Sequence, residues 1–349
     1  MDLELLQTRA AIIKNIRSFF DERKYLELDT PLLSPDLIPE SCLEVFQTER
    51  VFPYGSIKEN KPLWLIPSPE IWMKKIIAQH KTDVYQICKC FRNGESEGHL
   101  HSSEFTMLEY YTMNVSYLES LKITEELIAY LIMSKEQRAI ESAIRSKEQS
   151  NLYFEKESIL PFERITVAQA FEKWAGFDLF EAAKDISIME REAHKLGIDP
   201  LPGMTIPELY DLIFIHSVEP KLKTANPLFL LDYPAFVSCL AKKGGSRKEE
   251  GGSEENKKET VERWELYWNG IELANCFSEE TDPLKVKEFF TNEAAEKERH
   301  AIVKHKVDHD YWKLFEGFPK CSGVAMGVDR LIMALTGKRS IDGVLAFEV

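Results

Sequence analysis

An Asn-Gly pair, Asn269-Gly270, separates two strand-like segments and is the strongest constraint that this sequence places on its fold. Asparagine and glycine accept the positive φ angles that a two-residue type I′ turn requires. The segments on either side, 264–268 and 271–274, are therefore predicted to form a tight antiparallel hairpin. Because such a turn fixes the register of its two strands, it also decides which side chains face each other.

Two carboxylates are predicted to share one face of this hairpin. The two-residue turn places Tyr267 opposite Glu272. It places Glu265 opposite Ala274, which makes the two carboxylates diagonal neighbours. Neighbouring carboxylates repel each other unless a cation or a proton lies between them. A Mg²⁺ ion carried by a nucleotide is one such cation, and an arginine or lysine partner is the alternative.

The residues after the hairpin predict an irregularity in its second strand. Asn275, Phe277 and Glu279 alternate onto a single face and would extend the same polar pocket. The step from Glu272 to Asn275 breaks this alternation, so both residues can serve one site only if the strand ends or bulges between them. We predict a bulge or a strand end there.

A second hairpin with a long loop is predicted from residues 84–91 and 104–111, joined by the polar, glycine-containing stretch 93–103. One face of its returning strand carries Phe105, Met107, Glu109 and Tyr111. This face suits a flat aromatic base on Phe105 and a cationic group near Glu109 and Tyr111. A half-buried strand in which a lysine or arginine neutralises Glu109 is the alternative.

Two arginines stand beside patterned segments, Arg92 in the run 90–95 and Arg330 at the end of the glycine-containing run 323–331. Arginine presents a planar fork of donors that matches phosphate oxygens, so the pair suggests a polyphosphate clamp. The glycines beside Arg330 would let the backbone approach a ligand closely. A surface ion pair is the alternative for either arginine taken alone.

The remaining elements follow from periodicity. Residues 6–20 predict an amphipathic helix with Leu6, Ala10, Ile13, Ile16 and Phe20 on its apolar side. Residues 25–30 predict a strand that Pro31 ends. Further helices are predicted at about 116–150, 167–174, 186–196 and 206–217. Residues 241–260 contain no aromatic or large aliphatic side chain and predict a mobile loop, which is either a solvated insertion or a lid.

Composition excludes several classes of protein. The 349 residues have a formal net charge of −14, which argues against a general nucleic-acid binder although not against a local basic patch. The sequence shows neither a secretory signal nor an apolar run long enough to span a bilayer, so we expect a cytoplasmic protein without membrane contact. Six cysteines lack the spacing of a metal site and predict reduced, mostly packed thiols.

Together these segments resemble the class II aminoacyl-tRNA synthetases. The resemblance lies in Pro31 after a helix and strand, in Phe91-Arg92-Asn93 with 104–109, and in 323–330. Ser68-Pro69-Glu70, His101 and 270–275 are similar to the lysyl-tRNA synthetase branch. The match runs from about residue 6 to residue 347, and its combined motifs are highly specific.

The resemblance implies an α+β fold, with an antiparallel sheet flanked by helices. It implies one catalytic domain over 1–349, with a helical insertion at about 116–217 and the mobile loop at about 241–260. Only a few residues precede the first helix, so no anticodon-binding domain and no stable tRNA binding are expected. A homodimer through the first helix and strand is also implied.

Within this family, two features favour the free-standing paralogues that attach (R)-β-lysine to elongation factor P. One is the absence of a barrel before the first helix, and the other is Ala325, where synthetases usually have glycine. A methyl group in the amino-acid pocket changes discrimination by about 1 to 3 kcal/mol, so the preference for (R)-β-lysine over lysine would be leaky.

The resemblance also implies roles for individual residues. For ATP these are Arg92, Glu95, His101, Phe105 and Arg330, of which Arg92 and Arg330 would be catalytic. For Mg²⁺ they are Glu265 and Glu272. For the amino acid they are Glu70, Glu109, Tyr111, Asn275, Glu279 and Ala325. The sequence departs from the family pattern at Gly94, which intervenes before Glu95, and at Cys276, which replaces a glycine.

The expected activity is therefore ATP-dependent formation of an aminoacyl adenylate, followed by transfer to a lysine side chain of elongation factor P. One alternative is a lysine-activating ligase that uses tRNA or a small molecule as acceptor. Another is a non-catalytic paralogue, which the presence of both arginines and both Mg²⁺ carboxylates disfavours.

Overall fold

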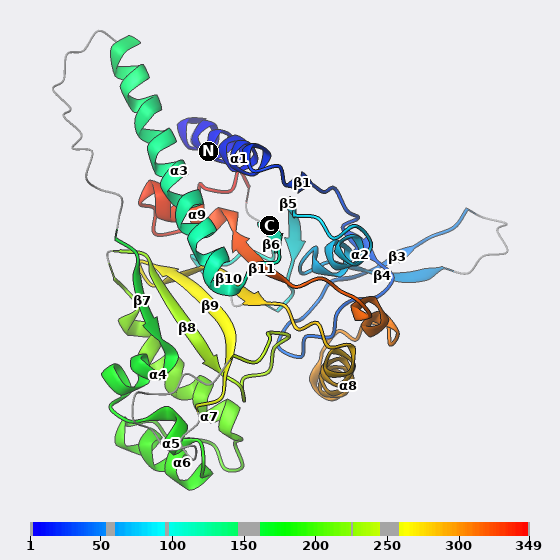
Figure 1. The fold of residues 1–349 in the computed structure, drawn as a ribbon, viewed down its shortest axis with the longest axis vertical. Helices are drawn as coiled ribbons and strands as arrows, with labels where there is room; N and C mark the ends of the chain where they lie inside the picture. The colour runs from blue at the N-terminus through cyan, green and yellow to red at the C-terminus, as the bar shows by residue number, and fades with distance from the viewer. Residues whose placement is uncertain are drawn as a thin grey trace. The chain divides into compact units, whose positions relative to one another are not determined.

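The computed structural model describes residues 3–53, 60–94, 98–145, 161–224, 226–244 and 258–347, with the backbone alone for 135–145. The chain forms two compact units (Figure 1). Unit 1 comprises Met1–Val115 and Glu279–Val349, and unit 2 comprises Ser116–Ser278. The predicted α+β class, with a mainly antiparallel sheet flanked by helices, is confirmed. Organisation as one catalytic domain with an insertion stays a prediction.

Four strands of unit 1 are ordered β1-β5-β6-β11. Their bounds are β1 (Leu26–Glu27), β5 (Val84–Phe91), β6 (Glu104–Met113) and β11 (Cys321–Gly327). Strand β1 runs parallel to β5, and the other two pairings are antiparallel. The predicted hairpin of β5 and β6 is confirmed, whereas the strand predicted at 25–30 is reduced to two residues.

Helices cover this part of unit 1. They are α1 (Leu3–Glu22), α2 (Glu70–His80), α8 (Pro283–His300), η4 (Tyr311–Phe315) and α9 (Val328–Thr336). The predicted amphipathic α1 is confirmed, but its buried stripe is Leu5, Ile12, Ile16, Phe19 and Phe20. Ile16 and Phe20 are buried as predicted, and Phe20 stacks on Tyr85 of β5 at 4.8 Å. The prediction was wrong at Ala10, which is exposed, whereas Leu5, Ile12 and Phe19, each one residue before a predicted position, are buried.

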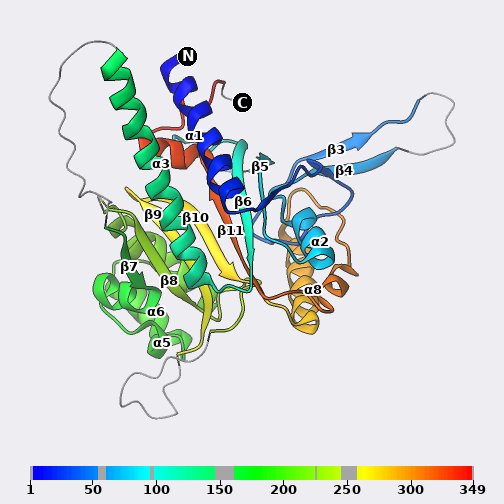
Figure 2. The same cartoon turned by 45° about the horizontal axis from the view of Figure 1, so that its top comes forward.

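A separate three-stranded sheet in unit 1 was not predicted. It has the order β2-β4-β3, with antiparallel pairing of β2 (Leu33–Ser34), β4 (Lys61–Leu65) and β3 (Gln47–Arg50). Strands β3 and β4 form an arm that extends away from α2 and α8 in both views (Figure 2). All four residues of β3 are exposed, so no periodic apolar face marks this strand in the sequence.

Unit 2 contains four strands ordered β10-β9-β8-β7. Their bounds are β7 (Glu163–Thr166), β8 (Leu228–Pro234), β9 (Thr260–Trp268) and β10 (Ile271–Ser278). The predicted Asn-Gly hairpin joins β9 and β10, and both turn residues have the positive φ of a type I′ turn, 54° at Asn269 and 78° at Gly270. The predicted bulge is also present, between Glu272 and Ala274.

The helices of unit 2 lie near the predicted positions. They are α3 (Tyr117–Arg145), α4 (Val167–Ala170), η1 (Phe171–Ala175), α5 (Leu179–Ala182), α6 (Ile186–Lys195), α7 (Ile206–Ile213), η2 (Phe214–Val218) and η3 (Glu219–Lys221). Their core includes Phe171 stacked on Tyr210 at 5.3 Å. Helix α3 is fastened by the Trp264 indole N–H, which donates to the Tyr117 carbonyl at 2.6 Å.

Three smaller predictions have different outcomes. Most of the predicted mobile loop, 245–257, lies outside the described residues, and at its ends Gly244 N–H donates to the Thr260 carbonyl at 2.8 Å. All six cysteines are free thiols, as predicted. Among the described helices none is both long and apolar enough to cross a membrane.

Candidate functional site

A cluster of buried charged side chains occupies the centre of unit 1. Lys74 of α2 has no exposed side-chain surface and contacts two carboxylates. One belongs to Glu70, four residues earlier on the same helix, and the other to Glu279, whose Oε2 lies 2.7 Å from the Lys74 ammonium. Glu279 is positioned by its backbone N–H, which donates to the carbonyl of Cys321 on β11. A helix and a strand thus hold opposite sides of one ammonium group.

A third carboxylate, Glu109 of β6, lies beside this group and is 2% exposed. Its Oε1 accepts from the Tyr111 hydroxyl at 2.5 Å, and its Oε2 accepts from the Ser68 hydroxyl at 2.7 Å. The Ser68 oxygen in turn accepts the backbone N–H of Glu70 at the start of α2. The prediction that Glu109 and Tyr111 share a face is confirmed, and a tyrosine and a serine rather than a cation contact Glu109 directly.

The cluster contains more acidic than basic groups. The pKa of Glu109 is raised to about 8, by burial first and then by the charge of Glu70. Burial also raises the pKa of Glu279 to about 7, against the lowering effect of Lys74. Burial lowers the pKa of Lys74, but Glu279 and Glu70 outweigh it and hold that pKa well above its usual value. Three carboxyl groups therefore share one lysine, which leaves the cluster able to accept further cations.

Strand β11 faces these acids with very small residues. In the β6–β11 register Gly323 lies opposite Tyr111, and Ala325 lies opposite Glu109. A Cβ atom on Gly323 would lie 2.6 Å from Oε1 of Glu279, which is a buried oxygen without a hydrogen-bond partner in the described part of the chain. Because Gly323 has no side chain, the carboxylate of Glu279 has room beside β11. Its Oε1 has no hydrogen-bond partner among the described residues.

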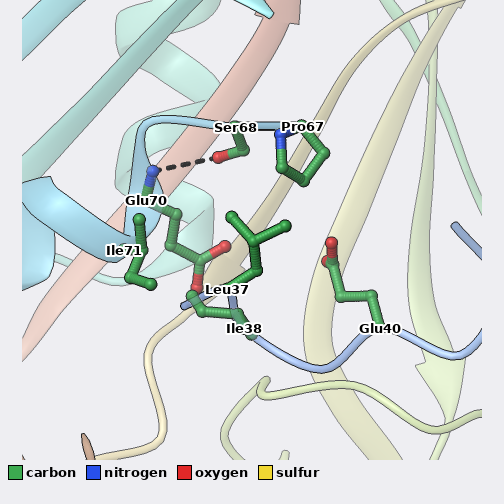
Figure 3. Close-up of a pocket in the computed structure, with 7 residues that line it drawn as sticks. All are labelled: Leu37, Ile38, Glu40, Pro67, Ser68, Glu70 and Ile71. Atoms are coloured by element: carbon green, nitrogen blue, oxygen red, sulfur yellow. Dashed lines mark hydrogen bonds between the residues drawn. The ribbon is translucent and has the colours of Figure 1, made fainter. Parts of the chain in front are cut away.

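Glu70 also lines a pocket at the surface of this cluster (Figure 3). The lining residues are Leu37, Ile38, Glu40, Pro67, Ser68, Glu70 and Ile71. Because Ser68 and Glu70 belong to both the pocket and the charged cluster, a ligand in the pocket would contact these acidic groups directly.

The residues predicted to bind ATP lie elsewhere in unit 1, around the β5–β6 loop. Arg92 closes this loop through its backbone N–H, which donates to the Ser103 carbonyl at 3.0 Å. Its guanidinium lies over the Phe105 ring at 5.3 Å, and its Nε is buried without a hydrogen-bond partner among the described residues. A guanidinium and an aromatic face are therefore adjacent, as a clamp for a nucleotide requires.

Arg330 lies in the first turn of α9, after Gly327. Its Nε donates to the carbonyl of Leu100 in the β5–β6 loop at 3.3 Å, so the loop and the helix are in contact. His101 is half-buried in the same loop, whereas Glu95 lies outside the described residues. The structure therefore brings Arg330 to the loop that follows Arg92, as the clamp hypothesis expects.

The predicted Mg²⁺ carboxylates lie in unit 2. The bulge adds one residue to β10, so Glu265 is opposite Asn275 and not, as predicted, opposite Ala274. Arg263 approaches Glu265 Oε1 at 2.5 Å, which is the arginine partner that the sequence left open. Glu265 Oε2 accepts hydrogen bonds from Tyr233 and Tyr267.

Carboxylates are the donor type that suits Mg²⁺, but in this structure Arg263, Tyr233 and Tyr267 contact the oxygens of Glu265. The pKa of Tyr267 is raised by burial and then by the charges of Glu265 and Glu272, so both carboxylates act on one hydroxyl. No group of three His, Cys, Asp or Glu side chains in the described ranges is arranged to hold a metal. Mg²⁺ commonly takes one or two carboxylates and completes its shell with phosphate and water oxygens.

Sequence reasoning missed several members of these sites. The contact of Lys74 with Glu70 could have been predicted from their i,i+4 spacing on a helix. The contact of Arg263 with Glu265 could have been predicted from their i,i+2 spacing on a strand. No such spacing marks Glu40, because it lies in an irregular loop. Asp329 and Arg9 were also missed. Arg9 Nη1 lies 2.5 Å from Asp329 Oδ1, and the two residues are too far apart in the sequence for a local pattern to predict this contact.

Comparisons with known proteins agree with this geometry. The family model for class II tRNA synthetases (D, K and N) matches residues 3–349. An elongation factor P–(R)-β-lysine ligase of Avibacterium paragallinarum is 31% identical over 99% of this chain and 96% of that protein. One from Vibrio atlanticus is 32% identical over 99% and 95%.

A lysine–tRNA ligase of Carboxydothermus hydrogenoformans is 34% identical over 97% of this chain but only 64% of that protein. This chain therefore matches the two elongation factor P ligases over nearly their whole length, and the tRNA ligase over 64% of its length. The resemblance expected from the motifs is confirmed: this chain belongs to the class II tRNA synthetase family (D, K and N) and, within it, groups with the elongation factor P–(R)-β-lysine ligases.

Proposed function

We propose that this chain is an ATP-dependent ligase that activates (R)-β-lysine, or lysine, as an adenylate and transfers it to a lysine side chain of elongation factor P. The observation that carries the proposal is the buried cluster in which Lys74 pairs with Glu70 and Glu279 and acts electrostatically on Glu109. The names of the relatives supply the acceptor and the amino acid.

The cluster is suited to a substrate with two ammonium groups. A buried carboxylate is stable as an anion only when a cation or several hydrogen bonds compensate it. Glu279 has a buried, unsatisfied oxygen, and Glu109 is neutralised in part by protonation. The ammonium groups of lysine or (R)-β-lysine would supply these missing charges, with the Tyr111 hydroxyl available as a further polar contact.

The nucleotide would be held by Arg92, Phe105, His101 and Arg330. Arg92 and Arg330 would bind the α- and γ-phosphates, and Phe105 would stack on adenine in place of the Arg92 guanidinium that now lies over its ring. The buried Nε of Arg92 offers an unused donor for this contact. Glu95 is also proposed to bind ATP.

Activation needs no covalent enzyme intermediate. A carboxylate oxygen of the amino acid attacks the α-phosphorus, the bond from that phosphorus to the β-phosphate oxygen breaks, and pyrophosphate leaves. Arg92 stabilises the charge that develops on the phosphoryl oxygens and orients the attacking carboxylate. The amine of the acceptor lysine then attacks the acyl carbon, loses a proton, and AMP leaves.

In unit 2, Glu265 and Glu272 would hold Mg²⁺, which supplies neutralisation of phosphate charge when it is bound. Ala325 would restrict the amino-acid pocket from β11, opposite Glu109. We also propose a homodimer through α1 and β1, which sedimentation would detect as twice the chain mass of 40.3 kDa.

The test is ATP–pyrophosphate exchange with (R)-β-lysine and with lysine, followed by transfer to purified elongation factor P or to tRNA. Arg330→Ala should lower exchange by about 10² to 10³ fold, because it removes a charged donor to the phosphates. Arg299→Ala is the control, since Arg299 lies on the exposed side of α8 and pairs with Glu296.

Each other outcome has a definite meaning. Exchange with neither amino acid would overturn the proposed activity and favour a non-catalytic paralogue. Charging of tRNA without transfer to elongation factor P would favour a lysine–tRNA ligase, to which one relative in the same family corresponds. Full exchange by Arg330→Ala would remove Arg330 from the site.

A further inference from the structure

Glu40 lies in the loop between β2 and β3, and the reaction proposed above gives it no role. Its side chain lines the same pocket as Ser68 and Glu70. In Figure 3 the Glu70 side chain reaches the pocket from the start of α2, and the Glu40 side chain reaches it from the loop, on either side of Leu37. The rest of the lining is apolar, so these three side chains supply the polar contacts that a ligand would meet there.

The loop that carries Glu40 is held rigidly by α8. The Lys297 side chain is 4% exposed, and its ammonium group donates to the backbone carbonyl of Glu40 at 2.9 Å and to that of Leu43. The next backbone N–H, that of Ser41, donates to Glu293 Oε2 at 3.0 Å. A carboxylate on a loop fixed in this way has a defined position, as a recognition residue requires.

Among the described residues, the structure gives the carboxylate of Glu40 no hydrogen-bond or ion-pair partner, although the backbone carbonyl of Glu40 is bound by Lys297. The pKa of Glu40 is raised to about 7, by burial and then by the charge of Glu70, against the lowering effect of Arg92. Glu40 is therefore within electrostatic reach of both Glu70 and Arg92, which lie on different elements of unit 1.

Arg92 marks which end of the substrate Glu40 would meet. In the proposed reaction Arg92 binds the substrate carboxylate and the α-phosphate, so a carboxylate within its reach lies at the reactive end of the amino acid. The amine nearest that end is bonded to the α carbon in lysine and to the β carbon in (R)-β-lysine. These positions differ by one bond of about 1.5 Å, which a fixed carboxylate can distinguish.

We propose that Glu40 is a specificity-determining residue that binds the substrate ammonium group nearer the substrate carboxylate, and so selects between amines on the α and β carbons. This inference rests on the proposed function and adds Glu40 to its site. The pair Glu40 and Glu70 would flank that ammonium, while Glu109 and Glu279 remain for the ammonium at the other end of the chain.

The experiment measures kcat/KM of ATP–pyrophosphate exchange for (R)-β-lysine and lysine with Glu40→Gln and Glu40→Asp. Glu40→Gln should lower kcat/KM for the preferred amino acid by about 10 to 100 fold, the effect of losing a hydrogen bond to a charged group. The ratio of kcat/KM for (R)-β-lysine to kcat/KM for lysine should move towards one. Glu40→Asp keeps the carboxylate but has a side chain shorter by one methylene. This variant should therefore retain exchange and change the ratio of kcat/KM between the two amino acids. Glu49→Gln is the matched control, because Glu49 lies on the exposed strand β3.

A third compound separates recognition from folding. This compound, 6-aminohexanoic acid, would be tested as an inhibitor, and it has the terminal amine and the carboxylate of lysine but no amine on the α or β carbon. Its inhibition constant should therefore be the same in wild type and Glu40→Gln. An equal loss of affinity for this inhibitor and for the substrates would show that Glu40 only shapes the pocket, and would overturn the inference.

The two proposals fail in different ways. If wild type exchanges but Glu40→Gln keeps both kcat/KM and the ratio, the role of Glu40 is wrong and the proposed function stands. If wild type exchanges with neither amino acid, the proposed function itself is wrong and the role of Glu40 falls with it.

Discussion

Gly323 is a position at which a single atom decides whether the buried cluster can form. A Cβ atom there would lie 2.5 Å from Cε1 of Tyr111 and 2.6 Å from Oε1 of Glu279, both closer than real contacts allow. The sequence suggested that glycines near Arg330 admit a ligand to the backbone. In the structure Gly323 has a different use, because it makes room for two of the protein's own side chains.

Gly323→Ala is therefore expected to lower the free energy of unfolding by about 1 to 3 kcal/mol, the usual cost of forcing an atom into a packed interior. Gly327→Ala is the control for stability on the same strand, since its Cβ would first meet Arg330 at 3.7 Å, an ordinary contact. Chemical denaturation measures both variants. Equal stability of the two would show that Tyr111 and Glu279 can move aside at little cost.

At the scale of elements, Arg9 joins α1 to β6 and α9. Its Nη1 lies 2.5 Å from Oδ1 of Asp329, and its Nη2 donates to the Thr106 hydroxyl at 2.8 Å. The backbone N–H of Thr106 donates to the other oxygen of Asp329 at 2.7 Å, which closes the network. Asp329 is 2% exposed, so this pair is shielded from water. The network fixes the helix that carries Arg330, the neighbour of Asp329.

Arg9→Met should destabilise the protein by about 3 to 5 kcal/mol, because it leaves the buried charge of Asp329 without its partner. Arg17→Met is the matched control on the same helix. Arg17 pairs with Glu27 at 2.8 Å with both side chains largely exposed, and such a pair contributes about 0 to 1 kcal/mol. Urea denaturation compares them, and a loss for Arg17→Met as large as that for Arg9→Met would contradict the role given to burial.

Across the whole molecule, the buried acids predict that the ligand-free protein loses stability as pH rises. The pKa of Glu109 is raised from 4.5 to about 8 by burial, so between these values the folded state keeps a proton that the unfolded state releases. The unfolded state is then favoured by each increase in pH. This contribution is fully stabilising below pH 4.5 and is lost as pH rises through about 8.

Glu109→Gln removes this titration. The free energy of unfolding of the variant, measured relative to wild type, should rise between pH 5 and pH 8, because wild type alone carries the growing cost of ionising the buried acid. Thermal denaturation at a series of pH values measures the difference. A difference that stays constant over this range would mean that Glu109 ionises in the folded protein as easily as in the unfolded one.

The outcome of sequence reasoning differed by scale. Local features were predicted well: the Asn269-Gly270 turn, the β5–β6 hairpin, the bulge after Glu272 and helices α1, α3, α4, α6 and α7, although not α2, α5, α8 and α9. Their conformations depend on φ preferences and periodicity over a few residues. The exposed strand β3 and the buried face of α1 were predicted less well, because both depend on contacts with residues that are distant in the chain.

By itself, the sequence determined the family, the fold class and the identities of the acids and arginines, since motif spacing and turn chemistry are local properties. Tertiary structure alone decided that Lys74 lies between Glu70 and Glu279 and that Arg263 contacts Glu265. It also placed Glu40 in the pocket of Glu70. The physical reason is that a charge acquires its pKa and its partner from burial and from neighbours, which the chain specifies only when it has folded.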